Sequence, residues 1–300
     1  MLRTPQETAS FSNLPRGRRE ELINPKLAFH LGYQMMFTVS AIFLLHLILS
    51  FAVGSLWVTL ITVIAEKKGS VLGGILGGLP STSAFSFFFI GINQSTAAAV
   101  EATTVFPLAF GVTSAYLFLY AFFASKSFSR GIGFSLLIWF AVSGLIVASG
   151  LKDFGVCLGV GAVVSVLTYY GFAKVLRLQN LKGQETRYKL WEIVFRGVGA
   201  GALVMVAVLL SQVGGPVLGG IAAAFPAVFT STLIILQRSR GTEFSRAVTK
   251  PLVLSGILTI IPFCVAVRYL YPALGVLFGT LVSYVLVVPL AVLSYYLAQR

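Results

Sequence analysis

The chain has 300 residues, of which 57% are hydrophobic and 10% are charged, and its mean hydropathy is +0.92. A water-soluble globule of this composition would expose more apolar area than folded proteins tolerate, so the composition excludes that class. The formal net charge of +13 lies mostly between the apolar runs. That distribution favours anionic lipid headgroups as partners and indicates no nucleic-acid partner.

Uncharged apolar runs long enough to cross about 30 Å of hydrocarbon recur along the whole chain. Strands of a membrane β-barrel would alternate apolar and polar residues, and these runs do not. We therefore predict an all-α, polytopic integral membrane protein of the cell (inner) membrane, surrounded by membrane lipids. The two cysteines, Cys157 and Cys264, lie in apolar segments and indicate neither a disulfide framework nor a metal site.

Residues 1–26 are polar and are predicted to form an unprocessed cytoplasmic tail, because the apolar run that follows is too long for a signal peptide. From Leu27 to Ala65 there is no Lys, Arg, Asp or Glu. A single helix over this run would be about 58 Å long, roughly twice the hydrocarbon thickness. Its length favours two spans joined by a tight turn near Ser50–Ser55, with one long helix as the open alternative.

Eight further apolar segments complete a predicted set of ten transmembrane helices. Residues 27–150 form a first five-helix repeat and residues 151–300 a second, within a single membrane domain. The eight further spans are Ser70–Ile92, Ala102–Ala124, Gly131–Gly150, Phe154–Ala173, Leu190–Val213, Pro216–Leu236, Leu252–Tyr269 and Leu274–Leu297.

The distribution of basic residues supports this count. With the N-terminus inside, all but three of the 22 Lys and Arg residues face the cytoplasm, as the positive-inside rule requires. Lys152 and Arg268 fall outside, and Arg196 lies within a span. Both termini are therefore predicted to be cytoplasmic.

A Gly/Pro motif occurs twice. Val71-Leu72-Gly73-Gly74-Ile75 leads to Pro80, and Val217-Leu218-Gly219-Gly220-Ile221 leads to Pro226. In both copies the proline follows the first valine by nine residues, and Ser and Thr come after it. The copies lie in the third span of each half, and an odd number of spans per half reverses the orientation. The sequence thus predicts a five-plus-five inverted repeat, a layout that supports alternating access.

Each motif proline lies near the middle of its span, where the loss of an N–H donor favours a break in the helix. Half-helices that begin there would turn N–H groups and a positive dipole end toward an anionic or carbonyl-bearing ligand. The glycines could instead serve close helix packing, and the hydroxyls could bond back to carbonyls of a kinked helix. The predicted substrate-binding residues of the two motifs are Gly77, Gly78, Pro80, Ser81, Thr82, Ser83, Pro226, Thr230, Ser231 and Thr232.

Four ionisable residues are further candidates. Arg196 lies inside a span one turn after Glu192; the two could bind or gate an anionic substrate, or could form a structural pair while Arg196 snorkels to the cytoplasmic face. Glu101 could take up a proton or cation at the outer mouth, or could be a solvated carboxylate at a helix start. His46 could relay protons, or could make an interhelical hydrogen bond.

The sequence contains no Asp-rich motif, no His cluster, no Ser/His/Asp set and no nucleotide-binding motif. We therefore predict no catalytic residues, no cofactor and no metal site, and expect that the protein is not an enzyme.

The run Lys67-Lys68-Gly69-Ser70-Val71-Leu72-Gly73-Gly74, leading to Leu79-Pro80, resembles small inner-membrane proteins of the GlpM type. Those chains are much shorter and carry such a segment once. The resemblance covers about one span and its flanks in each half, and it implies no binding or catalytic residues. The ten-span layout is also similar to drug/metabolite-type and bile-acid-symporter-like transporters, which implies an architecture alone.

Together these features predict a secondary transporter or exporter of a small polar or anionic metabolite, working by alternating access around spans three and eight. Two other hypotheses stay open. One is a lipid-handling protein that flips or senses anionic or isoprenoid lipids, and the other is a non-transporting membrane assembly factor. The sequence is also compatible with a homo-oligomer.

Overall fold

The computed structural model describes residues 25–67, 79–178 and 189–298, and all regular secondary structure in these ranges is helical. The chain divides into two compact units, Met1–His46 and Leu47–Arg300, and each is considered by itself. Most of the predicted N-terminal tail lies outside the described residues, as do the candidate site residues Gly77 and Gly78.

Seven helical stretches among the described residues are long and apolar enough to cross a membrane, so the all-α and membrane-protein predictions are confirmed at that level. The helices, in chain order, are α3 (Pro25–Lys67), α5 (Ser81–Asn93), α6 (Thr96–Ala102), α7 (Phe106–Ala124), α8 (Phe128–Ser149), α9 (Phe154–Lys174), α10 (Leu190–Gly214), α11 (Pro216–Ala223), α12 (Ala227–Arg240), α13 (Thr242–Ala247) and α14 (Thr249–Ala298).

The predicted turn near Ser50–Ser55 is wrong, because α3 continues through it without a break. The apolar run contains no proline. Its Gly54 does not form a turn but allows α3 to pack closely against α10. A Cβ atom at Gly54 would come within 3.1 Å of a Val204 side-chain atom and 3.2 Å of the Gly201 Cα atom, both on α10. Small residues of this kind let two apolar helices approach closely. The predicted count of ten spans depended on this turn.

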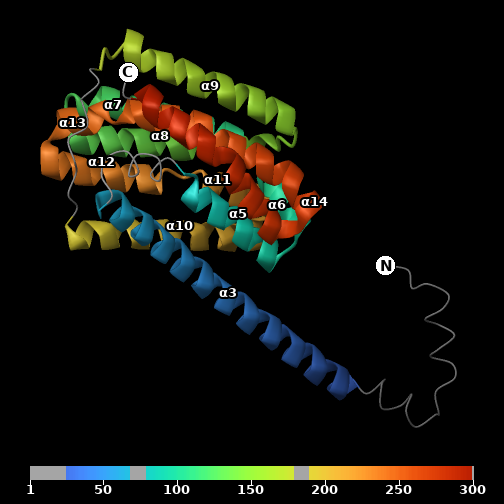
Figure 1. Ribbon diagram of the computed structural model, residues 1–300. Coiled ribbons are helices and arrows are strands. Elements are labelled where there is room, and N and C mark those ends of the chain that lie inside the picture. Colours follow the sequence, from blue (N-terminus) through green and yellow to red (C-terminus); the bar gives the residue numbers. More distant parts are fainter. Residues whose placement is uncertain (1–24, 68–78, 179–188, 299–300) are drawn as a thin grey trace, which may run out of the picture. The chain divides into compact units, whose positions relative to one another are not determined.

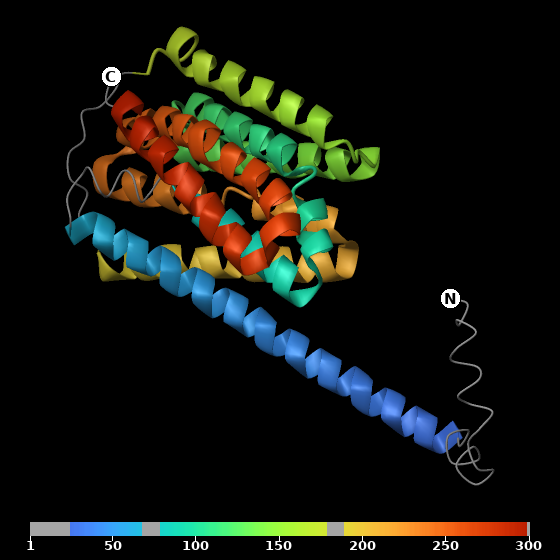
Figure 2. The ribbon, with the colours of Figure 1, turned by 45° about the vertical axis from the view of Figure 1, so that its right-hand side comes forward.

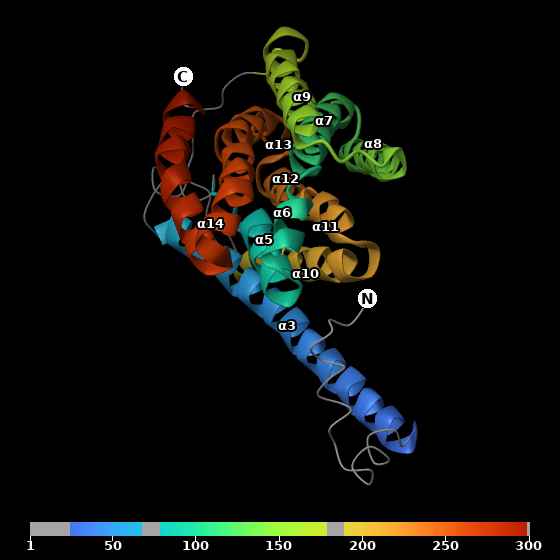
Figure 3. The same cartoon turned by 90° about the vertical axis from the view of Figure 1, so that its right-hand side faces the viewer.

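The last helix reverses direction at Gly275, whose backbone is not helical (φ 74°, ψ 173°). The rings of Phe263 and Tyr284 lie 5.1 Å apart between centroids, whereas a straight helix would separate these residues by about 31 Å. The two arms of α14 accordingly lie side by side (Figures 1 and 3). They correspond to the last two spans predicted from the sequence.

The core of the Leu47–Arg300 unit is formed by α7 and by the α11–α12 stretch. The apolar part of α7 is 67% buried and that of Pro216–Arg240 is 61% buried, whereas the apolar parts of α8 and α9 are only 28% and 22% buried. Figures 2 and 3 show α9 and α10 on opposite sides of this unit, with α7 and α11 between them. The second Gly/Pro motif therefore lies in the interior of the unit.

Candidate functional site

Each motif proline is the residue at which a helix starts. In the second copy α11 ends at Ala223 and α12 begins at Ala227, so the helix is interrupted just before and at Pro226. In the first copy Pro80 is the N-cap of α5. The backbone dihedrals are φ −77° and ψ 55° at Pro80, and φ −78° and ψ 39° at Pro226. The two prolines thus have nearly the same conformation.

The hydrogen bonds around the prolines match as well. The backbone N–H of Ser81 donates to the carbonyl oxygen of Leu79 (2.8 Å), and the N–H of Ala227 donates to that of Phe225 (2.9 Å). Each bond closes a three-residue turn centred on a proline, and the dihedrals are close to those of an inverse γ-turn. The turns around the two motif prolines therefore share a local backbone structure.

Both turns line one cavity of about 90 Å³, which we call the central cavity. Helices α3, α7, α10 and α14 complete its wall. Thr230, Ser231 and Thr232, which were also predicted to bind substrate, are not among its lining residues. The predicted site residues that do line it are Pro80, Ser81, Thr82, Ser83, Arg196 and Pro226.

From this cavity α5 and α12 run in opposite directions along α10. Beyond the end of α5, the Gln94 side-chain amide donates to Ser211 Oγ (2.8 Å), close to the C-terminal end of α10. Near the end of α12, the guanidinium of Arg238 lies 5.8 Å from the ring centroid of Trp191, in the first turn of α10. Trp191 and Ser211 are about 30 Å apart along a helix. Figure 1 shows the two half-helices leaving the middle of the unit toward opposite ends.

Several predicted hydroxyls bond to the backbone of their own helix. Ser83 Oγ donates to the carbonyl of Pro80 (3.3 Å), and Thr230 Oγ1 donates to that of Pro226 (2.7 Å). Two further hydroxyls, those of Ser231 and Thr232, donate to carbonyls in the same way. This back-bonding was the structural alternative for these residues, and here it accompanies an interrupted helix rather than a continuous kinked one.

Neither half-helix carries a side-chain cap at its N-terminus, within the part of the chain that the structure describes. The positive ends of two helix dipoles therefore face the central cavity. Trp57 of α3 donates from its indole Nε1 to Ser81 Oγ (3.3 Å), which positions that hydroxyl at the cavity wall.

Helix α7 stabilises the second break through contacts that sequence reasoning missed. Thr113 Oγ1 donates to the carbonyl oxygen of Ala224 (2.6 Å) and accepts from Trp139 Nε1 (2.9 Å). Tyr116 forms a hydrogen bond with Thr230 (2.8 Å between hydroxyl oxygens). In both contacts between α7 and the second break, the two partners are more than 100 residues apart in the chain. No local sequence pattern therefore indicates these contacts.

The glycines of the second motif serve close packing. A Cβ atom at Gly220 would overlap the carbonyl oxygen of Ala102, at the end of α6. One at Gly219 would lie 2.5 Å from Ser211 Cβ of α10. These positions exclude any larger residue, so the Gly-Gly pair brings α11 against α6 and α10.

Arg196 lies on α10, is half-buried and lines the central cavity. Its predicted partner Glu192 is 4% exposed, and its carboxylate accepts a hydrogen bond from the backbone N–H of Lys189 (2.8 Å). Glu192 thereby caps the N-terminus of α10. The pairing of Glu192 with Arg196 stays a prediction.

Glu101 is exposed on α6 and lines a different cavity, of about 650 Å³, together with Arg268. Arg268 was missed by sequence reasoning. Its Nη1 donates to Thr103 Oγ1 (3.2 Å) and Thr104 Oγ1 (3.1 Å), so it ties α14 to the end of α6. His46 belongs to the other unit of the chain.

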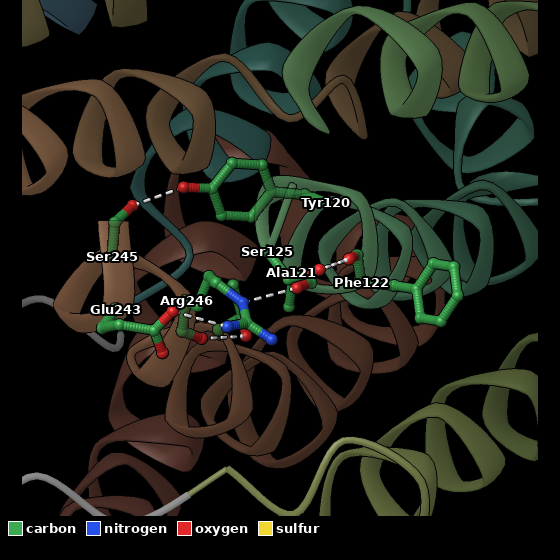
Figure 4. Close-up of polar contacts among 8 residues, drawn as sticks. Tyr120, Ala121, Phe122, Ser125, Glu243, Ser245 and Arg246 are labelled. Carbon is green, nitrogen blue, oxygen red and sulfur yellow. Dashed lines mark hydrogen bonds and ion pairs between the residues drawn. The ribbon is translucent and has the colours of Figure 1, made fainter. Parts of the chain in front are cut away.

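Away from the cavity of Glu101 and Arg268, hydrogen bonds hold α13 against the C-terminal end of α7 (Figure 4). Arg246 Nε donates to the carbonyl oxygen of Ala121 (2.7 Å), and Arg246 also pairs with Glu243 (2.7 Å). The hydroxyl oxygens of Tyr120 and Ser245 are 2.6 Å apart in a hydrogen bond. Because α13 directly follows α12, these contacts fix the far end of the second half-helix.

Among the described residues, no group of three His, Cys, Asp or Glu side chains could bind a metal ion. Comparison of the chain with protein-family models, with curated proteins and with solved structures finds no match in any of the three.

Proposed function

We propose that this chain is a secondary membrane transporter or exporter of a small anionic metabolite, and that the central cavity is its substrate site. The main support for this proposal is that two uncapped half-helices, α5 and α12, start at one cavity that is also lined by Arg196. Helix N-termini bind anions through their N–H groups and dipoles, and a guanidinium adds a full positive charge. A neutral or cationic solute would gain little from this arrangement.

The order of the helices around the cavity supports alternating access between two inverted sets. A half-helix of 13 residues (α5) precedes a short helix (α6) and a long one (α7). A half-helix of 14 residues (α12) likewise precedes a short helix (α13) and a long one (α14). Exchanging the conformations of two such sets would open the site first to one side of the membrane and then to the other.

The continuous α3 changes the proposed number of crossings. With α3 crossing once, the proposed transporter has nine spans: α3, the span that ends with α5, α7, α8, α9, α10, the α11–α12 stretch and the two arms of α14. Four spans on each side of α9 then form the two inverted sets. An odd number of crossings places the two chain ends on opposite sides. We propose a cytoplasmic C-terminus, because this keeps the basic loops after α7, α9 and α12 inside, and an N-terminal tail on the outer side.

Uptake by proteoliposomes tests the proposal. The purified chain is reconstituted, and uptake is measured for labelled phosphate, short carboxylates and matched neutral and cationic solutes. We expect uptake of at least one anion and of no cation. Arg196→Gln should reduce that uptake at least about tenfold, which corresponds to the loss of one charge-assisted contact. Arg130→Gln, at an exposed arginine of α8, is the matched control. Uptake confined to neutral or cationic solutes, or unaffected by Arg196→Gln, would contradict the proposal.

A further inference from the structure

An apolar groove of about 490 Å³ borders the central cavity, and we call it the lateral groove. It lies between α8, α10 and α11. Its volume falls within the range of about 300–1,000 Å³ that is typical of ligand sites. The central cavity, at about 90 Å³, is far smaller and has room for a head group only.

The lateral groove faces the apolar surroundings of the unit. Phe140, Val147 and Val206 line it and are 58%, 45% and 40% exposed, respectively. In a membrane protein, exposed apolar side chains of this kind face lipid hydrocarbon. Two polar side chains line the groove. The Trp139 indole N–H already donates to Thr113, and the Ser143 hydroxyl is buried and has no hydrogen-bond partner among the described residues. A polar metabolite would therefore lose most of its hydrogen bonds on entering, whereas a hydrocarbon chain would lose none.

Phe225 is shared by the two spaces, since it lines both the central cavity and the lateral groove. Its ring packs edge-on against Trp139 (5.1 Å between centroids) and tilted against Phe140 (5.5 Å). It directly precedes Pro226 and belongs to the turn that interrupts the helix. This half-buried side chain is thus common to the walls of an anion-attracting cavity and a lipid-facing groove.

We propose that the substrate is an amphipathic anion whose head group binds in the central cavity and whose single hydrocarbon chain lies in the lateral groove, past Phe225. This inference depends on the proposed function and names the substrate class of the same site. Since membrane lipid is as apolar as the groove, the chain gains little from hydrophobic transfer. Instead, the groove lets the hydrocarbon chain of the substrate extend out of the protein while the head group is bound in the central cavity. The groove therefore selects amphiphiles that enter from the membrane.

Two glycines of the groove allow a test by filling it. Gly144 on α8 and Gly199 on α10 line the groove, and a Cβ atom at either meets no other atom within 4 Å. Gly144→Leu and Gly199→Leu should therefore occupy the groove without disturbing the backbone. Gly133 on α8 also has open space around its Cβ position but does not line the groove. Gly133→Leu is the matched control.

The probe is 12-bromododecyl phosphate, because bromine on the chain quenches tryptophan fluorescence and Trp139 lies in the groove wall. In proteoliposomes we expect saturable quenching that is lost in Trp139→Phe. The half-quenching concentration should rise at least about tenfold in Gly144→Leu and Gly199→Leu, because the chain is sterically excluded. It should stay within about twofold of the wild-type value in Gly133→Leu. A brominated alkyl ammonium of equal chain length should not give saturable quenching.

Equal half-quenching concentrations in wild type and both groove variants would overturn the inference, as would equal quenching by the ammonium probe. Uptake of methyl phosphate together with absent binding of the long-chain phosphate would overturn the inference alone and leave the proposed function intact. If the long-chain phosphate is not bound and no anion is taken up, both proposals are wrong.

Discussion

Pro80 and Pro226 are 146 residues apart in the chain, yet they have nearly the same backbone conformation and line the same cavity. The half-helices that follow them leave the cavity in opposite directions along α10. Two equivalent and oppositely directed helix starts around one cavity are the feature on which the transport proposal depends.

The first prediction concerns the breaks themselves. Replacing both Pro80 and Pro226 by Ala should reduce anion uptake at least about tenfold without reducing thermal stability, because Ala is favoured over Pro within a helix by about 3 kcal/mol and lets α11 continue into α12 across the second break. Uptake and melting temperature in detergent are the measurements. Pro289→Ala, at an exposed proline inside α14, should leave uptake unchanged. Full uptake by the double variant would remove the case for this site.

The second prediction concerns the carbonyl group freed by the second break. Thr113→Val has nearly the same shape but leaves the carbonyl of Ala224 and the indole N–H of Trp139 without the threonine hydroxyl. We expect a loss of stability of about 1–3 kcal/mol, the usual cost of an unsatisfied buried polar group, seen as a lower melting temperature in detergent. Thr62→Val, which removes a hydroxyl that donates to the Val58 carbonyl of its own helix, should cost less. Equal effects would show that the interhelical bond is unimportant.

The third prediction concerns packing of the second motif. Gly220→Ala should destabilise the protein strongly, because the new methyl group would overlap the backbone of Ala102, and backbone displacement in a packed interior costs about 1–3 kcal/mol or more. Gly133→Ala, where the methyl group meets open space, is the control. Measurement of both melting temperatures checks the prediction, and an unaltered value for Gly220→Ala would contradict the close approach of α11 and α6.

Much of the helical layout could be predicted from the sequence, because each long apolar run has polar or Gly/Pro residues at its ends. Helices α8 to α10 begin and end within a few residues of the predicted bounds. The short helices α6 and α13 lie between predicted spans and carry no such signal. Another exception is α3, whose length predicts a turn that the structure does not have. Its glycine and small residues turned out to contact α10, and a single sequence cannot distinguish a packing surface from a turn.

The candidate site could be predicted in part, because only some of its residues act through their own local backbone. Proline acts on its own backbone, so the starts of α5 and α12 at Pro80 and Pro226 follow from local chemistry. Thr113, Trp139 and Arg268 act through contacts across the fold and carry no local signal. For the hydroxyls of the second motif the sequence leaves ligand binding and back-bonding open, and in the structure they donate to carbonyls of their own helix.

The fourth prediction concerns topology. With α3 crossing the membrane once, a cysteine at position 10 (Ser10→Cys) should react with a membrane-impermeant thiol reagent on intact cells. A cysteine near the other end (Ala298→Cys) should react only after permeabilisation. The background is Cys157→Ala/Cys264→Ala, which removes two buried thiols. Protection of both new cysteines on intact cells would restore an even number of crossings and a turn in α3.

Thiol labelling inside the central cavity tests the central claim most directly, and it needs no knowledge of the substrate. In the same cysteine-free background, Thr82→Cys and Val228→Cys place one thiol at each half-helix start on the cavity wall, and Ser165→Cys places one at a buried contact between α7 and α9. Alternating access predicts that each cavity thiol reacts with an impermeant reagent supplied from either side of the membrane, while position 165 reacts from neither. Reaction of the cavity thiols from one side only, or from neither, would contradict the account.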